Sequence, residues 1–476
     1  MLLSRDTLHL ADEYVAGYLA NDPEGHLTPY EEIKEVPPGH LLRIHHGQAD
    51  VMRHWYFSST SRIRHKTDHE YEEHFRHMFW RSVRRRLRSD SPVLAELSGG
   101  LDSSSIVCVA DDVLVADGTQ APGLDTLSYY DKTEPNGDDW IYLRKIEEIR
   151  GKVGFHIDAS KHGRSGSLEY GELIPLPEYL GIDRELEAER SEATRRGGHR
   201  VVLSGIGGDE FMGGVPDPRV YIADLIATFA FIRLAKQLVS WSLVKRRPAL
   251  QLLWESAMEL LPTRLSQHLA PESRIEPWIK KDFAKRTALA TRQMGPRKLF
   301  DLWLPTRRSY MAGVFLMGNK KAKAMPRMLT IEENRYPYLD QQLIEFILSI
   351  PASQLLRPGE RRSLMRRSLA GYVPAEVLSR STKQVAARGS LLAIANHWEQ
   401  LRHSFASPLS AQFGYIDRPQ FVNTLNSAIH GCELHIVRML RCISLEYWLR
   451  DLVGRQLIES ERGSCSKHHT AVRATP

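Results

Sequence analysis

Between residues 93 and 204, the chain alternates short apolar runs with longer amphipathic segments. Short apolar runs beside glycine or polar residues are typical of buried strands, and they occur at residues 93–97, 124–129, 154–157 and 200–204. Helical patterns begin near residue 103 and cover residues 137–150 and 184–196. Strands that alternate with helices form a parallel sheet with helices on both faces, so the pattern predicts an α/β fold. Ligands of such sheets bind beyond the carboxyl ends of the strands.

The flanking segments have a helical pattern. A helix with a basic side is predicted at residues 68–88. The second half is expected to be largely helical, with helices at residues 221–244, 249–261, 341–349, 361–370 and 434–459. We predict three parts: a small N-terminal piece at residues 1–57, a main domain at residues 68–460, and a disordered polar tail at residues 461–476.

The N-terminal piece has its own order of elements. Residues 14–19 have a helical pattern, and Pro37-Pro38-Gly39 predicts a turn that leads into a strand at residues 40–44. Residues 45–48 are expected to form a hairpin turn.

Composition excludes several classes of protein. The 476 residues carry a formal net charge of +6 and are 42% hydrophobic, as in soluble globular proteins. The four cysteines form no CxxC pair, so we predict neither a zinc site nor a disulfide framework. No signal peptide is recognisable, and the most apolar run, residues 221–235, contains Asp224 and Arg233. We therefore expect a cytoplasmic protein without a membrane partner. The arginines of residues 81–88 lack interleaved aromatic residues, so we expect a solvated helix face and no nucleic-acid partner.

The first strand ends in the turn Ser98-Gly99-Gly100-Leu101-Asp102-Ser103-Ser104, which leads into a helix. Backbone N–H groups and the positive end of a helix dipole converge there, which favours a phosphate oxyanion. No lysine follows the glycines, so the turn is not the loop that holds a γ-phosphate. Asp102 would repel phosphate unless a metal lay between them, which implies Mg²⁺. The turn resembles the pyrophosphate loop of the ATP pyrophosphatases.

A second glycine-rich turn, residues 204–214, follows the strand at residues 200–204. Its glycines indicate a tight turn or close contact with a ligand. Asp209 follows the glycines much as Asp102 follows its own, so the two carboxylates are candidates to hold one Mg²⁺ against ATP phosphates.

Two further blocks make the resemblance specific. Residues 333–340 read ENRYPYLD, similar to an ExRxPFLD motif, and residues 361–383 resemble a stretch that ends in R-x-K. Together with the two turns, these blocks resemble the synthetase domain of glutamine-hydrolysing asparagine synthetases, whose relatives include β-lactam synthetases and lasso-peptide cyclases.

The resemblance implies an ATP-pyrophosphatase domain, like that of the adenine nucleotide alpha hydrolases, which uses ATP and Mg²⁺. Such enzymes adenylate a carboxylate, release pyrophosphate, and let an amine attack the acyl-adenylate. The implied metal ligands are Asp102 and Asp209. The implied catalytic residues are Lys383, with a surface lysine as the alternative, and Glu333, with a structural partner of Arg335 as the alternative. The implied ATP and pyrophosphate contacts are Ser98, Gly99, Gly100, Asp102, Ser103, Ser104, Ser128, Ser204 and Gly205.

The chain departs from the family pattern in two places. In asparagine synthetases a Glu follows the Ser-Gly of the second turn, and in β-lactam synthetases a Tyr does, whereas here it is Ile206, which cannot accept a proton. The family's glutaminase domain uses an N-terminal Cys, but Leu2 follows Met1, and residues 1–57 resemble only the final segment of that domain. We expect no glutamine hydrolysis: either the domain is absent, or the true start lies upstream.

The sequence therefore predicts an AMP-forming amide ligase that activates an aspartate-like carboxylate. Its expected partners are a small-molecule or peptide carboxylate and an amine donor, with a separate glutaminase or a precursor peptide as further candidates. The missing acceptor at Ile206 favours a lasso-peptide cyclase, and free aspartate with ammonia is the alternative. A non-catalytic nucleotide-binding relative is a hypothesis of another class, against which the intact motifs argue. A tRNA-modifying pyrophosphatase lacks support, because no RNA-binding feature is recognisable.

Overall fold

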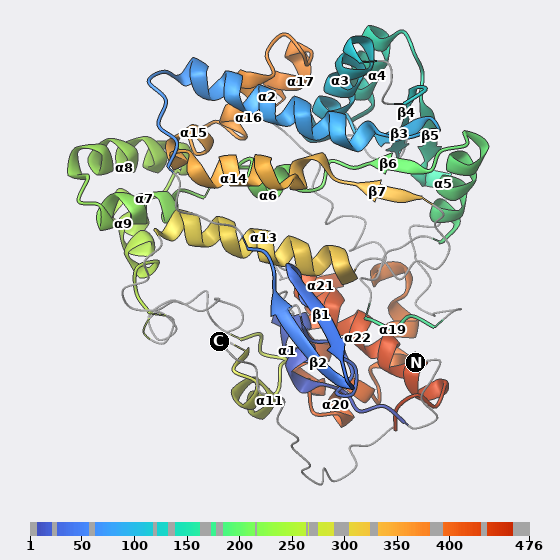
Figure 1. The fold of residues 1–476 in the computed structure, drawn as a ribbon. Helices are drawn as coiled ribbons and strands as arrows, with labels where there is room; N and C mark the ends of the chain where they lie inside the picture. The colour runs from blue at the N-terminus through green and yellow to red at the C-terminus, as the bar shows by residue number, and fades with distance from the viewer. Residues whose placement is uncertain are drawn as a thin grey trace.

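The computed structural model describes most of the chain, and the sheet forms one end of it (Figure 1). The described residues are 7–20, 26–56, 62–117, 121–131, 139–161, 173–177, 184–214, 217–262, 265, 275–289, 304–323, 332–380, 394–429 and 436–459. Five strands form one sheet in the order β5-β4-β3-β6-β7, and all of its paired neighbours are parallel. The strands are β3 (Val93–Glu96), β4 (Leu124–Tyr130), β5 (Phe155–Asp158), β6 (Val201–Leu203) and β7 (Glu333–Arg335). The predicted α/β fold with a parallel sheet is confirmed.

The strand order reverses between β3 and β6. From β3 the chain adds β4 and β5 on one side, and it then returns to place β6 on the other side of β3. The helices of this region are α2 (Asp68–Leu87), α3 (Leu101–Ala116), α4 (Asp139–Arg150) and α5 (Arg184–Arg196). Such a reversal is the place where open parallel sheets bind ligands, because neighbouring loops diverge there and leave a crevice.

The edge strand β7 was not predicted from the sequence. Its three residues are polar and carry no apolar run, so no strand signal exists. The strand forms because β6 offers it a partner, with Val201 opposite Glu333 and Leu203 opposite Arg335. Long-range pairing therefore decides this element.

The second half is helical, as predicted, although several bounds differ. Among its described residues, the helices of nine or more residues are α7 (Pro218–Ala227), α8 (Phe231–Lys245), α9 (Ala249–Met258), α13 (Pro305–Lys323), α14 (Gln341–Ser349), α21 (Arg418–Ile429) and α22 (Ile436–Gly454). The shorter ones are α6 (Gly208–Phe211), α11 (Lys281–Arg286), α15 (Ala352–Leu355), α16 (Ser363–Ser368), α17 (Ala375–Ser379), α19 (Trp398–Ser404) and α20 (Leu409–Gln412). Short helical turns also lie at Ala159–Lys161 and Pro337–Leu339.

Several predicted helix bounds are wrong. The helix expected at residues 221–244 is two helices, because the chain breaks at Phe229, whose φ of 53° is left-handed. Arg362 has the same backbone conformation, so α16 begins only at Ser363. Left-handed residues interrupt the helical hydrogen-bond pattern, and apolar periodicity does not reveal them.

The described residues form two large hydrophobic cores. The first joins α2, α3, the sheet, α7 and α14. The second joins α1 (Asp12–Ala20) and Tyr30 to buried residues within 278–289 and 394–458 at the other end of the molecule (Figure 1). The described residues between 8 and 30 therefore share a core with the C-terminal helices. The predicted boundary near residue 57 stays a prediction.

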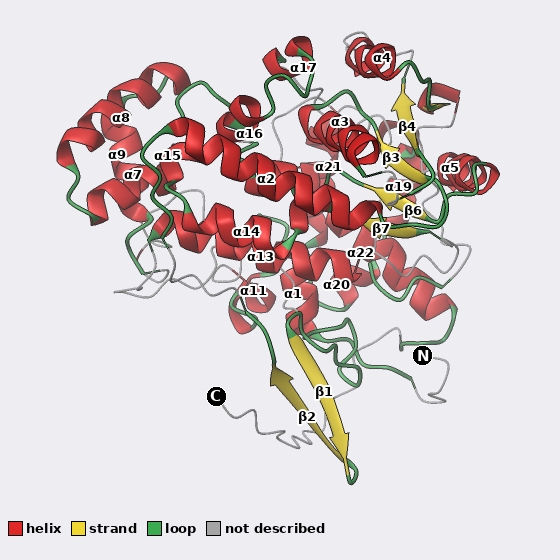
Figure 2. Cartoon of the chain, turned by 45° about the horizontal axis from the view of Figure 1, so that its top comes forward, coloured by secondary structure: helices red, strands yellow, loops and turns green. Residues whose placement is uncertain are grey.

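The predicted hairpin is β1 (His40–His45) with β2 (Gln48–Arg53). Its turn residues His46 and Gly47 both have positive φ, as a two-residue hairpin turn requires. Figure 2 shows the hairpin extending away from the body of the molecule. No helix in the described part of the chain is long and apolar enough to cross a membrane.

Candidate active site

The site lies where β3 and β6 end side by side. Their register pairs Val93 with Val201 and Ala95 with Leu203, so both glycine turns begin at the carboxyl ends of adjacent parallel strands. The first turn leads into α3, which begins at Leu101, two residues before the predicted start. The second leads into α6. The predicted juxtaposition of the two turns is therefore present in the structure.

Hydrogen bonds within the first turn hold its shape. The Ser103 hydroxyl lies 3.1 Å from the Ser98 hydroxyl, accepts from the Ser98 N–H at 3.1 Å, and donates to the Gly100 carbonyl at 3.2 Å. Gly99 has a φ of 67°, and a Cβ there would lie 2.6 Å from the Asp139 carbonyl oxygen. Only glycine fits this position, because both the backbone angle and the space exclude a side chain.

The second turn packs directly against the first. A Cβ at Gly205 would lie 3.3 Å from the Ser103 nitrogen, and one at Gly208 would lie 2.6 Å from the Asp102 carboxyl carbon. A Cβ at Gly214 would lie 2.2 Å from an Asp209 carboxylate oxygen. These glycines leave the space that the two carboxylates occupy.

Asp102 and Asp209 converge on Arg362. One terminal nitrogen of its guanidinium, Nη2, donates to Asp102 Oδ2 at 2.6 Å and also to Asp209 Oδ1. The Arg362 side chain is only 6% exposed, and its backbone N–H donates to the Gly213 carbonyl at 3.0 Å. One cation from a distant segment thus pairs with both predicted metal ligands.

The donor set fits a magnesium ion that is shared with a nucleotide. In the described ranges, no three or more His, Cys, Asp or Glu side chains are grouped so that they could hold a metal ion without other ligands. Mg²⁺ usually keeps one or two protein carboxylates and takes its other ligands from phosphates and water. Two converging carboxylates beside a phosphate-type turn meet that requirement.

Further arginines surround the turn, and of these the sequence indicated only Arg380, as the alternative to Lys383. A cavity of about 50 Å³ borders the turn, and its lining includes Arg361, Arg362, Arg366 and Arg380. Burial lowers the pKa of the Arg366 guanidinium, and the charges of Arg362 and Arg361 lower it further. The basic run at residues 361–367 was visible in the sequence, but the sequence does not show which of its arginines face the turn.

The predicted serine contacts differ in environment. Ser104 is buried in the first turn of α3, and Ser128 is buried in β4. Neither hydroxyl has a hydrogen-bond partner among the residues that the structure describes. Ser204 is also buried, and its N–H donates to the Arg335 carbonyl at 3.0 Å. Ser128 lies near the end of β4 and Ser204 directly follows β6, the two strands that flank β3, so both serines lie near the end of the sheet where the first turn begins.

Comparison with known proteins agrees with this geometry. The sequence model of the family described as "Asparagine synthase" matches residues 74–148 and 190–450, which is more than half of the chain. The chain belongs to the asparagine synthase family. The predicted family is confirmed, and with it the ATP-pyrophosphatase type of the predicted α/β fold.

Individual relatives are distant. "Asparagine synthetase [glutamine-hydrolyzing] 3" of Bacillus subtilis (strain 168) is 25% identical over 363 residues, 74% of this chain and 54% of that protein. "Amidase chyE" of Penicillium rubens is 23% identical over 407 residues, 75% of this chain and 58% of that protein. The chain therefore spans just over half the length of these curated relatives.

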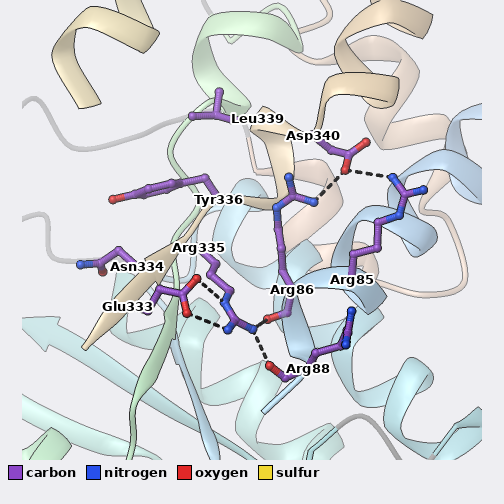
Figure 3. A pocket seen from close by; sticks show the side chains of 9 residues that line it. All are labelled: Arg85, Arg86, Arg88, Glu333, Asn334, Arg335, Tyr336, Leu339 and Asp340. Carbon is purple, nitrogen blue, oxygen red and sulfur yellow. Dashed lines mark hydrogen bonds and ion pairs between the residues drawn. The ribbon is translucent and has the colours of Figure 1, made fainter. Parts of the chain in front are cut away.

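The family's acidic position, Glu333, does not join the two turns. Glu333 begins β7 and is level with Val201, at the amino end of the sheet. Its carboxylate accepts from the Arg335 guanidinium at 3.0 and 2.8 Å, and it lines a hollow of about 660 Å³ together with Arg85, Arg86 and Arg88 (Figure 3). The hydrogen bonds from Arg335 lower the pKa of Glu333. This placement matches the alternative of a structural partner of Arg335.

Two other family positions complete the comparison. Lys383 lies outside the described residues, so the structure says nothing of its predicted role. Ile206, at the position of the family's Glu or Tyr, is 42% exposed in the second turn. The side chain of Arg380, three positions before Lys383, is buried. Its Nη1 donates to the Gly99 carbonyl at 3.2 Å, and its guanidinium pairs with Asp139.

Proposed function

We propose that the chain is an ATP-dependent amide ligase that forms AMP and pyrophosphate. In this proposal it adenylates an aspartate-like carboxylate and then lets an amine attack the acyl-adenylate. One observation carries the proposal: a glycine turn of the pyrophosphate-loop type lies at the strand-order reversal between β3 and β6, beside two converging carboxylates. ATP and Mg²⁺ are the proposed cofactors.

The residues of the turn would bind and orient the triphosphate. The N–H groups of Gly99 and Gly100 and the N-terminal end of α3 supply donors and a positive dipole for phosphate oxygens. Asp102 and Asp209 would hold Mg²⁺, which when bound neutralises phosphate oxygens and stabilises the leaving pyrophosphate. Arg362 would then lose its carboxylate partners to the metal, and its buried guanidinium would be available to the phosphates.

The amine step lacks a proton acceptor at the position where the family carries its Glu or Tyr. Ile206 has none, and Glu333 is held by Arg335 at the other end of the sheet. A second candidate function within the family therefore deserves a test: a macrolactam cyclase in which the substrate peptide supplies both the carboxylate and the amine. The absence of an acceptor at Ile206 favours it.

Exchange of ³²P-labelled pyrophosphate into ATP tests the proposal. We expect Mg²⁺-dependent exchange with aspartate or with a peptide that carries an aspartate or glutamate side chain, and AMP as the nucleotide product. ADP and phosphate as products would contradict an adenylating ligase. Binding of ATP without exchange for any carboxylate would support a non-catalytic nucleotide-binding relative. Cyclised peptide without free ammonia would identify the cyclase.

Lys383 is tested against Arg380, which lies three positions before it and has a buried side chain. A preorganised cation that stabilises a transition state is worth about 10²–10³-fold in rate. We expect Lys383→Met to lower turnover by that factor at an unchanged melting temperature. Arg380→Met should lower the melting temperature, because Arg380 anchors the first turn through Gly99 and Asp139. Full turnover in Lys383→Met would remove the lysine from the chemistry.

A further inference from the structure

Helix α8 has an apolar face toward the protein and a second one toward solvent. Trp241 is buried, and Leu234 and Leu238 pack against the first core. On the outer side, Ile232, Val239 and Leu243 recur at spacings of seven and four residues, which places them in one row. They are 78%, 59% and 74% exposed. A helix of a globular protein normally exposes a polar face here.

The apolar surface continues beyond this row. Phe229 and Phe231 precede it and are 74% and 64% exposed, and they contact each other at a ring distance of 6.1 Å. Leu250 and Trp254 on the neighbouring helix α9 are also exposed. We call these seven residues the α8 patch: Phe229, Phe231, Ile232, Val239, Leu243, Leu250 and Trp254. Contiguous exposed apolar patches of this kind mark interaction surfaces.

The charge of the same segment has one sign. Residues 229–247 contain five cationic and no acidic residues. The five are exposed, and they are Arg233, Lys236, Lys245, Arg246 and Arg247. Arg247 lies 3.4 Å from Glu255 of α9, so its charge is partly compensated. A partner that matches this surface therefore needs an apolar region that covers the patch and negative charges that pair with the surrounding cations.

We propose that the α8 patch docks the chain on the surface of an anionic phospholipid bilayer. Helices with large apolar side chains flanked by lysine and arginine lie in the interface between headgroups and acyl chains. Anionic headgroups attract the cations at that surface. The chain does not need to cross the membrane for this, in agreement with the absence of a spanning helix in the described ranges. This proposal departs from the sequence-based expectation of no membrane partner, which was drawn from the lack of a segment that could span a bilayer.

A second copy of the chain fits the patch less well. In a symmetric dimer the same patch meets itself, so cationic residues would lie opposite cationic residues. Like charges face to face disfavour that contact, whereas a negative lipid surface compensates them. The proposal does not rest on the ligase function, because α8 and α9 lie at the opposite end of the upper half of the molecule from the sheet (Figures 1 and 2).

Sedimentation of the full chain with vesicles tests the proposal. We expect pelleting with phosphatidylcholine vesicles that contain phosphatidylserine, little pelleting with phosphatidylcholine alone, and weaker binding in high salt. Ile232→Gln with Leu243→Gln should weaken binding by roughly 10-fold or more, because two large apolar side chains no longer enter the bilayer. Arg233→Gln with Lys236→Gln should weaken it by roughly 10–30-fold.

Val115→Gln provides the matched control. Val115 lies on α3 and is 89% exposed, so its substitution should leave vesicle binding unchanged. Unchanged melting temperatures and pyrophosphate exchange would show that the α8 variants are folded. The proposal is overturned if the chain does not pellet, if neutral vesicles bind equally well, or if the control weakens binding as much. It is also overturned if the α8 variants turn a dimer into a monomer without vesicles, since a second copy would then cover the patch.

Discussion

Two arginine–carboxylate groups built from the family motifs differ in burial and in reach. Arg362 joins Asp102 and Asp209; the side chains of Arg362 and Asp102 are 6% and 13% exposed, and Asp209, at the rim, is 38% exposed. Arg335 joins Glu333, whose side chain is 64% exposed, within one short strand. We call them the buried group and the exposed group. The buried group ties together three segments that are distant in sequence, whereas the exposed group is local.

The two groups differ in how much the loss of one charge should change the stability of the fold. Water and salt screen an exposed ion pair, so it contributes about 0–1 kcal/mol. Removal of one partner of a buried pair leaves an uncompensated charge in a poorly solvated site, which costs several kcal/mol. Because Asp102 and Asp209 need a cation beside them, a bound Mg²⁺ would take the place of Arg362.

The largest effect is expected from the carboxylates of the buried group. Asp102→Asn and Asp209→Asn each remove a charge from the proposed metal site with almost no change in volume. We expect each to lower Mg²⁺-dependent pyrophosphate exchange by about 10²–10³-fold, as for the loss of one charged contact to a transition state. Exchange rates measured over a series of Mg²⁺ concentrations check this. A variant with near wild-type exchange at low Mg²⁺ would show that its residue is not a ligand.

Arg362→Met should destabilise the free protein. It leaves Asp102 and Asp209 facing each other without a cation, which we expect to cost about 3 kcal/mol in the free energy of unfolding. Urea denaturation with and without millimolar Mg²⁺ measures this. Mg²⁺ should restore part of the loss in Arg362→Met and have little effect on the stability of the unmodified chain without nucleotide. An equal response of both proteins to Mg²⁺ would contradict an exchange of Arg362 for the metal.

A fourth carboxylate, Asp224, shows how burial raises a pKa. Asp224 is 9% exposed and accepts from the Thr306 N–H at 3.0 Å. Burial raises its pKa to about 6. Because the folded-state pKa lies above the unfolded value, its contribution to stability is full below about pH 4 and is lost as the pH rises through about 6.

Asp224→Asn should remove this pH dependence. The variant is expected to be about 2–3 kcal/mol more stable than the unmodified chain at pH 7.5 and similar to it near pH 4. Urea midpoints at both pH values check the difference. A constant offset between the two proteins at all pH values would show that Asp224 does not titrate as inferred.

The smallest effect is expected from the exposed group. Glu333→Gln removes a charge that Arg335 holds at the surface, and it should change the free energy of unfolding by less than about 1 kcal/mol. If Glu333 is a structural partner only, pyrophosphate exchange should change by less than about threefold. Arg335 keeps its bonds to the carbonyls of Arg86 and Arg88, at 2.9 and 2.6 Å. A loss of exchange as large as that of Asp102→Asn would instead return Glu333 to the chemistry.

Local signals in the sequence were enough to predict the elements that form the site. The strand, the glycine turn and the helix around Ser98 to Ser104 follow from short-range signals: an apolar run, glycines, and a new periodicity. The second turn and Asp209 follow in the same way, and the order of the four motifs was enough to indicate the family. Such signals suffice because neighbouring residues fix these conformations.

The tertiary structure alone decided which distant residues meet. Arg362 reaches Asp102 across 260 positions of sequence, and no local pattern distinguishes it from Arg361 or Arg366. β7 exists because β6 offers it a partner, and that pairing places Glu333 at the amino end of the sheet. The exposure of Ile232, Val239 and Leu243 on α8 could not be predicted either, because apolar residues on several sides of a helix do not show which side packs against the core. Long-range pairing and burial are properties of the whole chain, which is why they could not be predicted from its segments.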